Sequence, residues 1–223
     1  MRAANSALYA GRLPINTCLA AVVRLGLDTT QKLVLSFSMQ ELFKSQSKVL
    51  QLQMRQALEH SIKISALCYL LARRIDQFDA EEAMLAGLLH DIGVVAILCY
   101  AEMFIDPSSD HQQISNAITR FRSQISGMIL RQWEFPAEII DASVEAENWE
   151  RDPSRPLDYA DLIIVAQRYC LEEHAGTGAI PAMEELSSFK KLLPGKSQPE
   201  EKLALIHEIF READQLETLL QSK

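Results

Sequence analysis

The sequence predicts an all-α protein, and three observations support this prediction. Apolar residues recur at spacings of three and four through nearly every segment, which is the period of an amphipathic helix. No convincing run alternates between apolar and polar residues as a half-buried strand does. Glycine and proline are scarce, with eight of each among 223 residues, while 48% of the residues are hydrophobic. A chain of this length and composition can bury a substantial core, so we expect a multi-helix bundle.

The first 45 residues are expected to form short helices. The opening resembles the end of a helix that stops at Gly11 and has no N-terminal cap of its own. We therefore expect this chain to start inside a larger domain. A helix over residues 17–25 should close at Gly26 in a left-handed cap. Another is expected over residues 29–43.

Residues 46–223 are expected to form the helical core. Asp79, with Glu82 three residues later, is a pair typical of a helix start. Gly93 is expected to allow a bend in the helix that follows, whose apolar pattern continues to Phe104. Further core helices are expected over residues 48–75, 114–133, 136–149, 157–173, 182–193 and 199–220, with a turn at 107–110, a surface loop at 151–156 and a mobile loop at 194–201.

Charge and cysteine content exclude several classes of protein. The net charge of −8 would repel a phosphate backbone, and no run of Lys and Arg reverses it locally, so nucleic acid is not an expected partner. The four cysteines are far apart and form no CxxC pair, as in a reduced cytoplasmic protein. The longest nearly apolar run, GVVAILCYA, is far shorter than the roughly 20 residues that cross a bilayer, and no secretory signal is present. We expect a cytoplasmic protein without a membrane partner.

A histidine and an aspartate, His90 and Asp91, lie side by side in the apolar run AGLLHDIGVV. Burying both without partners would cost several kcal/mol. His60, on the preceding predicted helix, would add a third donor, and together they could bind one Zn, Mn or Fe ion with water in the open positions. Alternatively, the histidines hydrogen-bond to Asp91 or to helix carbonyls as a buried polar cluster. Spacing alone favours this second interpretation.

Two apolar stretches are expected either to pack in the core or to bind a partner. Trp133, Phe135 and Pro136 predict a packed helix–helix corner, although an aromatic corner could also be a docking point. The stretch LVLSFSMQELF, residues 33–43, is apolar enough for the core, but an exposed side would offer a partner surface. The sequence leaves both alternatives open.

Five motifs follow one another in an order typical of one family. They are ANSALY near the start, LG before a helix, HS beginning at His60, LLHDIG around His90, and W..P..I beginning at Trp133. Together they resemble the HDOD family, the HD-related output domains of bacterial signalling proteins, over nearly the whole chain. The resemblance implies one HD-like helical domain over residues 1–223 of a bacterial protein. It implies that residues 1–45 are the remnant of an N-terminal helical subdomain, since the helices that precede the ANSA motif in the family are missing. It also implies a regulatory role in signal transduction, through a protein partner or an adjacent signalling domain.

HDOD domains resemble the HD superfamily of metal-dependent phosphohydrolases, whose ligand positions can be followed along this chain. The first His of the superfamily falls on His60, and its His-Asp pair falls on His90 and Asp91. Its other ligand positions fall on residues of different types: Arg122 for a His, Ala146 and Glu147 for a His-His pair, and Gln167 for a closing Asp. The resemblance therefore implies that only the first part of the ligand set is kept.

The replaced positions oppose hydrolysis. A catalytic cation needs enough donors to offset its dehydration and to activate a bound water. Arg122 would add positive charge if it pointed inward. Asp161 lies about 120° from Gln167 around their helix and is not an easy replacement, whereas Asp158 and Glu145 stay open as replacements.

We therefore expect a non-catalytic module with no required cofactor. His60, His90 and Asp91 would form a vestigial or weak site for Mn, Fe or Zn. One alternative is a metal-dependent phosphohydrolase that acts on a nucleotide or cyclic dinucleotide. Another is a sensor that holds a nucleotide in the degenerate pocket without cleaving it.

Overall fold

The computed structural model describes residues 2–6, 9, 14–43, 47–104, 111–172, 181–192 and 198–221, and this part of the chain contains helices joined by turns and loops, without a strand. The predicted all-α class is thus confirmed. The helices are α1 (Arg2–Asn5), α2 (Cys18–Leu25), α3 (Leu27–Met39), α4 (Lys48–Ala72), α5 (Ala80–Leu89), α6 (Ile92–Phe104), α7 (His111–Gln132), α8 (Ala137–Val144), α9 (Tyr159–Glu172), α10 (Ser187–Lys191) and α11 (Pro199–Gln221), with two 3-10 turns, η1 (Gln40–Leu42) and η2 (Met183–Glu185).

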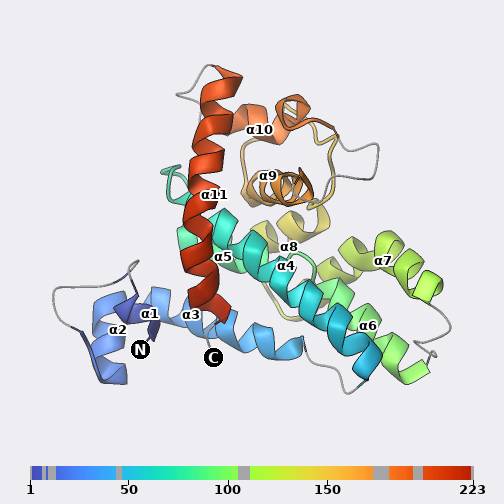
Figure 1. The fold of residues 1–223 in the computed structure, drawn as a ribbon, viewed down its shortest axis with the longest axis horizontal. Helices are drawn as coiled ribbons and strands as arrows, with labels where there is room; N and C mark the ends of the chain where they lie inside the picture. The colour runs from blue at the N-terminus through green and yellow to red at the C-terminus, as the bar shows by residue number, and fades with distance from the viewer. Residues whose placement is uncertain are drawn as a thin grey trace.

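The long helix α4 runs through the middle of the fold (Figure 1). It packs against α5, α9 and α11, and α6 and α7 form a pair on one side of it. The first three helices lie on the other side, where α3 contacts α5. Because α4 and α5 share the most extensive contact in the core, the side chains that they turn toward each other lie in fixed positions.

The N-terminal helices form close to the predicted ranges. Thr17 caps α2, since its hydroxyl accepts a hydrogen bond from the Ala20 N–H at 3.1 Å. Gly26 has the positive φ that favours glycine, 81°. Its ψ of 162° differs from the predicted left-handed cap, because α3 begins at the very next residue. Gly11 lies outside the described residues, and the division of the chain at residue 45 stays a prediction.

The α4–α5 pair is held by a close backbone contact. A Cβ at Gly87 would lie 2.8 Å from the Cα of Ser65, a distance that leaves no room for a side chain. Beside it, the Ser65 hydroxyl donates to the Met84 carbonyl at 2.7 Å. Asp79 caps α5 as predicted, by accepting from the Glu82 N–H at 2.8 Å. The contact at Gly87 fixes the last turn of α5 against α4.

The predicted bend at Gly93 is wrong in position. Helix α5 ends at Leu89 and α6 begins at Ile92, so the break falls on His90 and Asp91. Gly93 instead allows α6 and α7 to cross closely, because a Cβ there would lie 2.2 Å from the carbonyl oxygen of Arg122. Its N–H also donates to the Ser126 hydroxyl at 2.8 Å. The glycine therefore serves helix packing.

The segment Ala80–Phe104, which contains α5 and α6, is apolar and long enough to be considered as a membrane span. However, 83% of its most apolar window is buried inside the fold. Burial of this kind is typical of a core helix pair.

Two other expectations, the bounds of α8 and the exposure of Arg151, change with the structure. Pro136 precedes α8 instead of being its first residue, and α8 ends at Val144, five residues before the predicted end. Arg151, predicted in a surface loop, has only 2% of its surface exposed. The predicted turn at 107–110, and residues 194–197 of the predicted mobile loop, lie outside the described residues.

Candidate functional site

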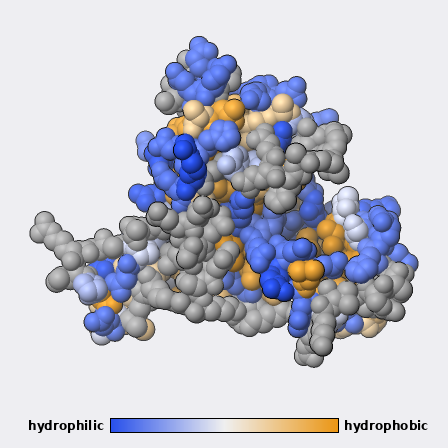
Figure 2. Space-filling view, viewed as in Figure 1, coloured by the Kyte–Doolittle hydropathy of each residue, from blue (hydrophilic) through white to orange (hydrophobic). Residues whose placement is uncertain are grey.

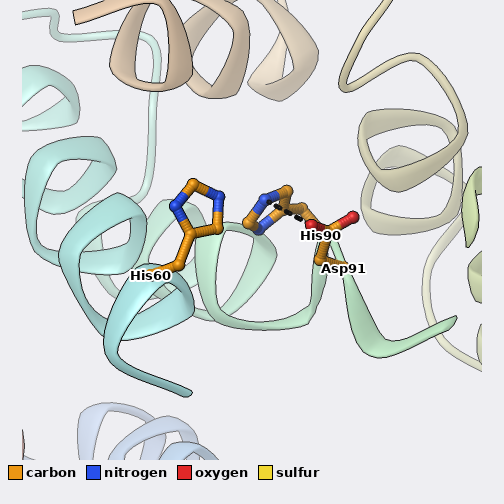
Figure 3. Close-up of side chains that lie close together, drawn as sticks. All are labelled: His60, His90 and Asp91. Carbon is orange, nitrogen blue, oxygen red and sulfur yellow. Dashed lines mark ion pairs between the residues drawn. The ribbon is translucent and has the colours of Figure 1, made fainter. Parts of the chain in front are cut away.

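His60, His90 and Asp91 meet where α4 passes the junction between α5 and α6 (Figure 3). His60 projects from α4, His90 follows the last residue of α5, and Asp91 precedes α6. One potential ligand atom of each residue lies within 4.8 Å of the other two, and the two imidazole rings are 5.3 Å apart between centroids. Within the described part of the chain, this is the only group of three such side chains close enough to hold one metal ion.

His90 is oriented by its own helix. Its Nδ1 lies 2.7 Å from the Gly87 carbonyl oxygen, and because a carbonyl only accepts, Nδ1 carries the proton. The lone pair is then on Nε2, which is buried and has no hydrogen-bond partner among the described groups. Burial lowers the pKa of His90 despite the opposing effects of Asp91 and the Gly87 carbonyl. A neutral ring with one nitrogen oriented by a backbone carbonyl is the form in which His binds metals.

His60 is also neutral at pH 7. Burial, and next the proximity of His90, lower the pKa of His60 to about 4. Asp91 is then the one carboxylate of the cluster, and its Oδ2 lies 3.7 Å from Nε2 of His90. Two neutral imidazoles and one carboxylate are a donor set suited to a single Zn, Mn or Fe ion.

Arg122 of α7 points into this site. Its Nη1 lies 3.4 Å from Oδ2 of Asp91, so the guanidinium pairs with the carboxylate of the cluster. Its Nε donates to Oε2 of Glu147 at 2.9 Å, and its Nη2 contacts the other oxygen of the same carboxylate. This two-point pairing fixes the orientation of the guanidinium. Arg122 therefore points inward, which is the orientation in which its charge opposes a bound cation.

The other positions at which the superfamily has ligands lie beside Arg122. Glu147 pairs with Arg122, and the preceding residue, Ala146, is buried. The side-chain amide of Gln167 on α9 donates to the Ala146 carbonyl at 2.8 Å. A continuous set of contacts thus joins Asp91, Arg122 and Glu147. It ends at the backbone of Ala146, to which Gln167 donates. These residue types are not those of a metal-binding site, but the superfamily's ligand positions lie close together in the fold.

A second charged cluster surrounds the buried guanidinium of Arg151. It pairs with Asp158, with Asp161 at 2.9 Å and with Glu145 at 3.6 Å. Asp158 and Glu145, which the sequence left open as replacement ligands, therefore bind an arginine. No sequence signal pointed to this cluster, because the run that contains Arg151 has the composition of a surface loop.

Asp161 is bound further by Lys191 at 2.8 Å and by the Ser188 hydroxyl at 2.6 Å. Burial raises the pKa of this carboxyl, but the hydrogen bonds from Lys191, Ser188 and Arg151 outweigh it and hold the pKa below its usual value of 3.8. Asp161 is thus an ionised structural group, in agreement with its poor position as a replacement for Gln167.

Three solved structures have this fold. A protein from Shewanella amazonensis SB2B, described provisionally as a metal-dependent phosphohydrolase, is 23% identical with a TM-score of 0.79, and the match covers 99% of this chain and 78% of that one. An HDOD domain protein of unknown function from Geobacter sulfurreducens is 21% identical with a TM-score of 0.69, over 96% and 80% of the two chains. A protein from Marinobacter aquaeolei VT8, described provisionally as a signal transduction protein, is 20% identical with a TM-score of 0.64, over 98% and 51%.

The family itself is identified from the sequence. No curated protein matches the chain. The model of the HDOD domain matches residues 1–149, a shorter part of the chain than the resemblance implied. The matched part contains His60, His90, Asp91 and Arg122, and the solved structures extend the shared fold through α9 to α11. The chain belongs to the HDOD domain family.

Proposed function

We propose that this HDOD domain is a non-catalytic regulatory module that acts inside the cell by binding a protein partner or a neighbouring signalling domain. The observation that carries the proposal is the guanidinium of Arg122, which pairs with both Asp91 and Glu147. In this proposal His60, His90 and Asp91 are an inherited cluster that stabilises the junction of three helices. The signal transduction role described for the Marinobacter protein supports the proposal by shared fold.

Arg122 opposes a metal ion in two ways. It neutralises Asp91, the carboxylate of the cluster, and it adds a permanent positive charge 3.4 Å from that donor. At an effective dielectric constant of about 20, a guanidinium and a divalent cation about 6 Å apart repel each other by roughly 5 kcal/mol. A cation that binds here must overcome that repulsion as well as its own dehydration.

The described neighbours supply no free replacement donor. Glu147 is held by Arg122, and the amide nitrogen of Gln167 is directed at a backbone carbonyl. Glu145 and Asp158 pair with Arg151. Activation of water toward neutral pH needs a cation held firmly by its ligands, and this donor set favours weak binding.

A second candidate function is a metal-dependent phosphohydrolase, and one observation favours it. Nε2 of His90 is buried without a partner, which costs free energy unless a group binds it. His60, His90 and Asp91 would hold the ion, which when bound would supply a Lewis acid and an activated water. In that case His60 and His90 donate nitrogen lone pairs, and Arg122 would bind an anionic substrate group.

Metal content and hydrolysis together separate the two functions. The purified protein is analysed for Mn, Fe and Zn by mass spectrometry and is assayed with bis(p-nitrophenyl) phosphate and with a cyclic dinucleotide. We expect far less than one metal ion per chain and no turnover above that of Asp91→Ala. Asp141→Ala, which removes an exposed carboxylate of α8, is the matched control. Near-stoichiometric metal, together with hydrolysis that is lost in Asp91→Ala and kept in Asp141→Ala, would overturn the proposal.

The binding role is tested with the cluster removed. A His60→Ala, Asp91→Ala double variant that keeps its helical circular dichroism should capture the same protein partner as the wild type, because the proposed role needs no metal. Loss of that partner in the double variant alone would show that the cluster itself is required.

A further inference from the structure

We infer that the cavity between α6 and α7 is a binding site for a small, uncharged, apolar molecule. Its volume is about 480 Å³, within the usual range of small-molecule sites, about 300–1,000 Å³. Leu42 of the turn η1 (Gln40–Leu42) lies on one side of the cavity. Its principal wall residues are Leu42 of η1, Ile92 and Cys99 of α6, and Met128, Gln132 and Trp133 of α7.

Both apolar stretches that the sequence left open meet at this cavity. Leu42 belongs to the stretch 33–43, and Trp133 belongs to the predicted aromatic corner, where its ring lies 6.4 Å from that of Phe135. Trp133 is 43% exposed and Met128 is 66% exposed. Figure 2 shows apolar surface among polar surroundings on the side of the molecule where α6 and α7 lie. The corner therefore leaves part of its apolar surface free.

The absence of charge among the described lining residues favours an uncharged ligand. Among the described residues that line the cavity, eight of nine are apolar, the ninth is Gln132, and none is charged. A charged ligand group held against these walls would lose part of its water without gaining an opposite charge, which costs free energy. An uncharged apolar ligand has no such cost, and the Gln132 amide can bond to one polar group on it. Trp133 supplies a flat surface for ring stacking, and the flexible side chain of Met128 adapts to ligand shape.

The position of the cavity connects a bound ligand to the His90 cluster through the two helices that form its walls. Helix α6 begins directly after Asp91, and α7 carries Arg122, so the cavity walls belong to the two helices that the Asp91–Arg122 pair joins. A bound ligand contacts both helices and should stabilise their packing. This inference does not rest on the absence of catalysis.

The test uses two fluorescent probes that differ mainly in charge. N-phenyl-1-naphthylamine is uncharged, and 1-anilinonaphthalene-8-sulfonate has the same ring system with a sulfonate. We expect the uncharged probe to bind with one-to-one stoichiometry and the sulfonate to bind at least about tenfold more weakly. Ala96→Phe, which fills the cavity from α6, should weaken the uncharged probe at least about tenfold. Ala204→Phe, on the exposed face of α11, is the matched control and should leave binding unchanged.

A measurement on the wild-type cavity avoids dependence on that variant. Cys99 lines the cavity and is partly exposed, whereas Cys68 and Cys170 are buried. In a Cys18→Ser background, which removes the exposed thiol, saturating N-phenyl-1-naphthylamine should slow alkylation of Cys99 several-fold.

Three outcomes would overturn the inference. One is no binding of the uncharged probe, or binding that Ala96→Phe leaves unchanged. Another is a rate of Cys99 alkylation that the probe does not alter. The third is a dimer, seen by sedimentation, that Ala96→Phe dissociates, because the cavity would then be covered by a second copy of the chain.

Discussion

The Arg151 cluster and the His90 cluster differ in how their buried groups are balanced by charge. Around Arg151 each charge meets an opposite one, and the Arg151 side chain is only 1% exposed. Asp161 is fully buried and is bound by two cations and a hydroxyl. Each charged group of the cluster thus has a partner in the folded chain, which is the arrangement that a buried charge requires.

Around His90 the pairing is incomplete. Asp91 has Arg122, and Nδ1 of His90 has the Gly87 carbonyl, but Nε2 of His90 is buried without a partner. The comparison teaches that a buried charged cluster is not by itself a binding site. Nε and Nη1 of Arg151 also lack a hydrogen bond, but they belong to a cation that pairs with carboxylates. Nε2 belongs to a neutral ring, and Arg122 opposes the cation that could bind it.

The largest expected loss of stability follows from removal of the Arg151 charge. Arg151→Met leaves three carboxylates without their shared cation and should lower the free energy of unfolding by about 3–5 kcal/mol, measured with urea. Arg155→Met is the control, because Arg155 pairs with Glu145 from a position that is 42% exposed and should contribute less than about 1 kcal/mol. Equal effects of the two variants would show that the Arg151 cluster is not the buried structural unit described above.

A smaller loss is expected where α6 crosses α7, beside the His90 cluster. Gly93→Ala places a methyl group against the rigid backbone carbonyl of Arg122 and should cost about 1–3 kcal/mol in urea unfolding. Ser126→Ala removes only the hydrogen bond to the Gly93 N–H and should cost about 1 kcal/mol. If Gly93→Ala were as stable as the wild type, the close crossing would be absent in solution.

Acid should weaken the Arg151 cluster. Because the pKa of Asp161 is below its usual 3.8 in the folded chain, ionised Asp161 stabilises the fold above that usual value. This contribution is lost as pH falls below about 4 and through the lowered pKa. Asp161→Asn lacks the contribution at every pH, so its free energy of unfolding should fall less steeply than that of the wild type over this range. Parallel curves for the two proteins would contradict the assignment.

The smallest expected change in stability is at Arg122. Its side chain is 24% exposed, so the ion pairs of Arg122 with Asp91 and Glu147 are partly hydrated. Arg122→Met should therefore change the free energy of unfolding by no more than about 1 kcal/mol. A loss as large as that of Arg151→Met would place Arg122 among the structural charges and would remove the contrast between the two clusters.

Local signals in the sequence predicted most of the helices and the cap at Asp79. Asp79 caps α5 through a bond to a residue three positions later, which a sequence can reveal. Thr17 caps α2 in the same way, although it was predicted as the first residue of that helix. The break at His90 was missed because residues 83–95, on both sides of it, are all buried, so the apolar pattern continues across it. The role of Gly93 depends on α7, and no local pattern contains that information.

The site was predictable in part. The resemblance selected His60, His90 and Asp91, which the structure brings together. The pairing of Arg122 with Glu147 depends on the directions of two side chains 25 residues apart, which the sequence does not specify. The burial of Arg151 likewise depends on partners in other elements.

Titration of Mn²⁺ into the wild type and into Arg122→His, followed by calorimetry, tests the central claim most directly. Arg122→His removes the opposing charge and adds an imidazole beside Asp91, whereas Arg120→His adds one at an exposed position of the same helix. We predict at least about tenfold tighter binding in Arg122→His than in the wild type, with Arg120→His unchanged. Tight one-to-one binding by the wild type, unchanged or weakened in Arg122→His, would contradict the claim that Arg122 keeps a cation out of this site.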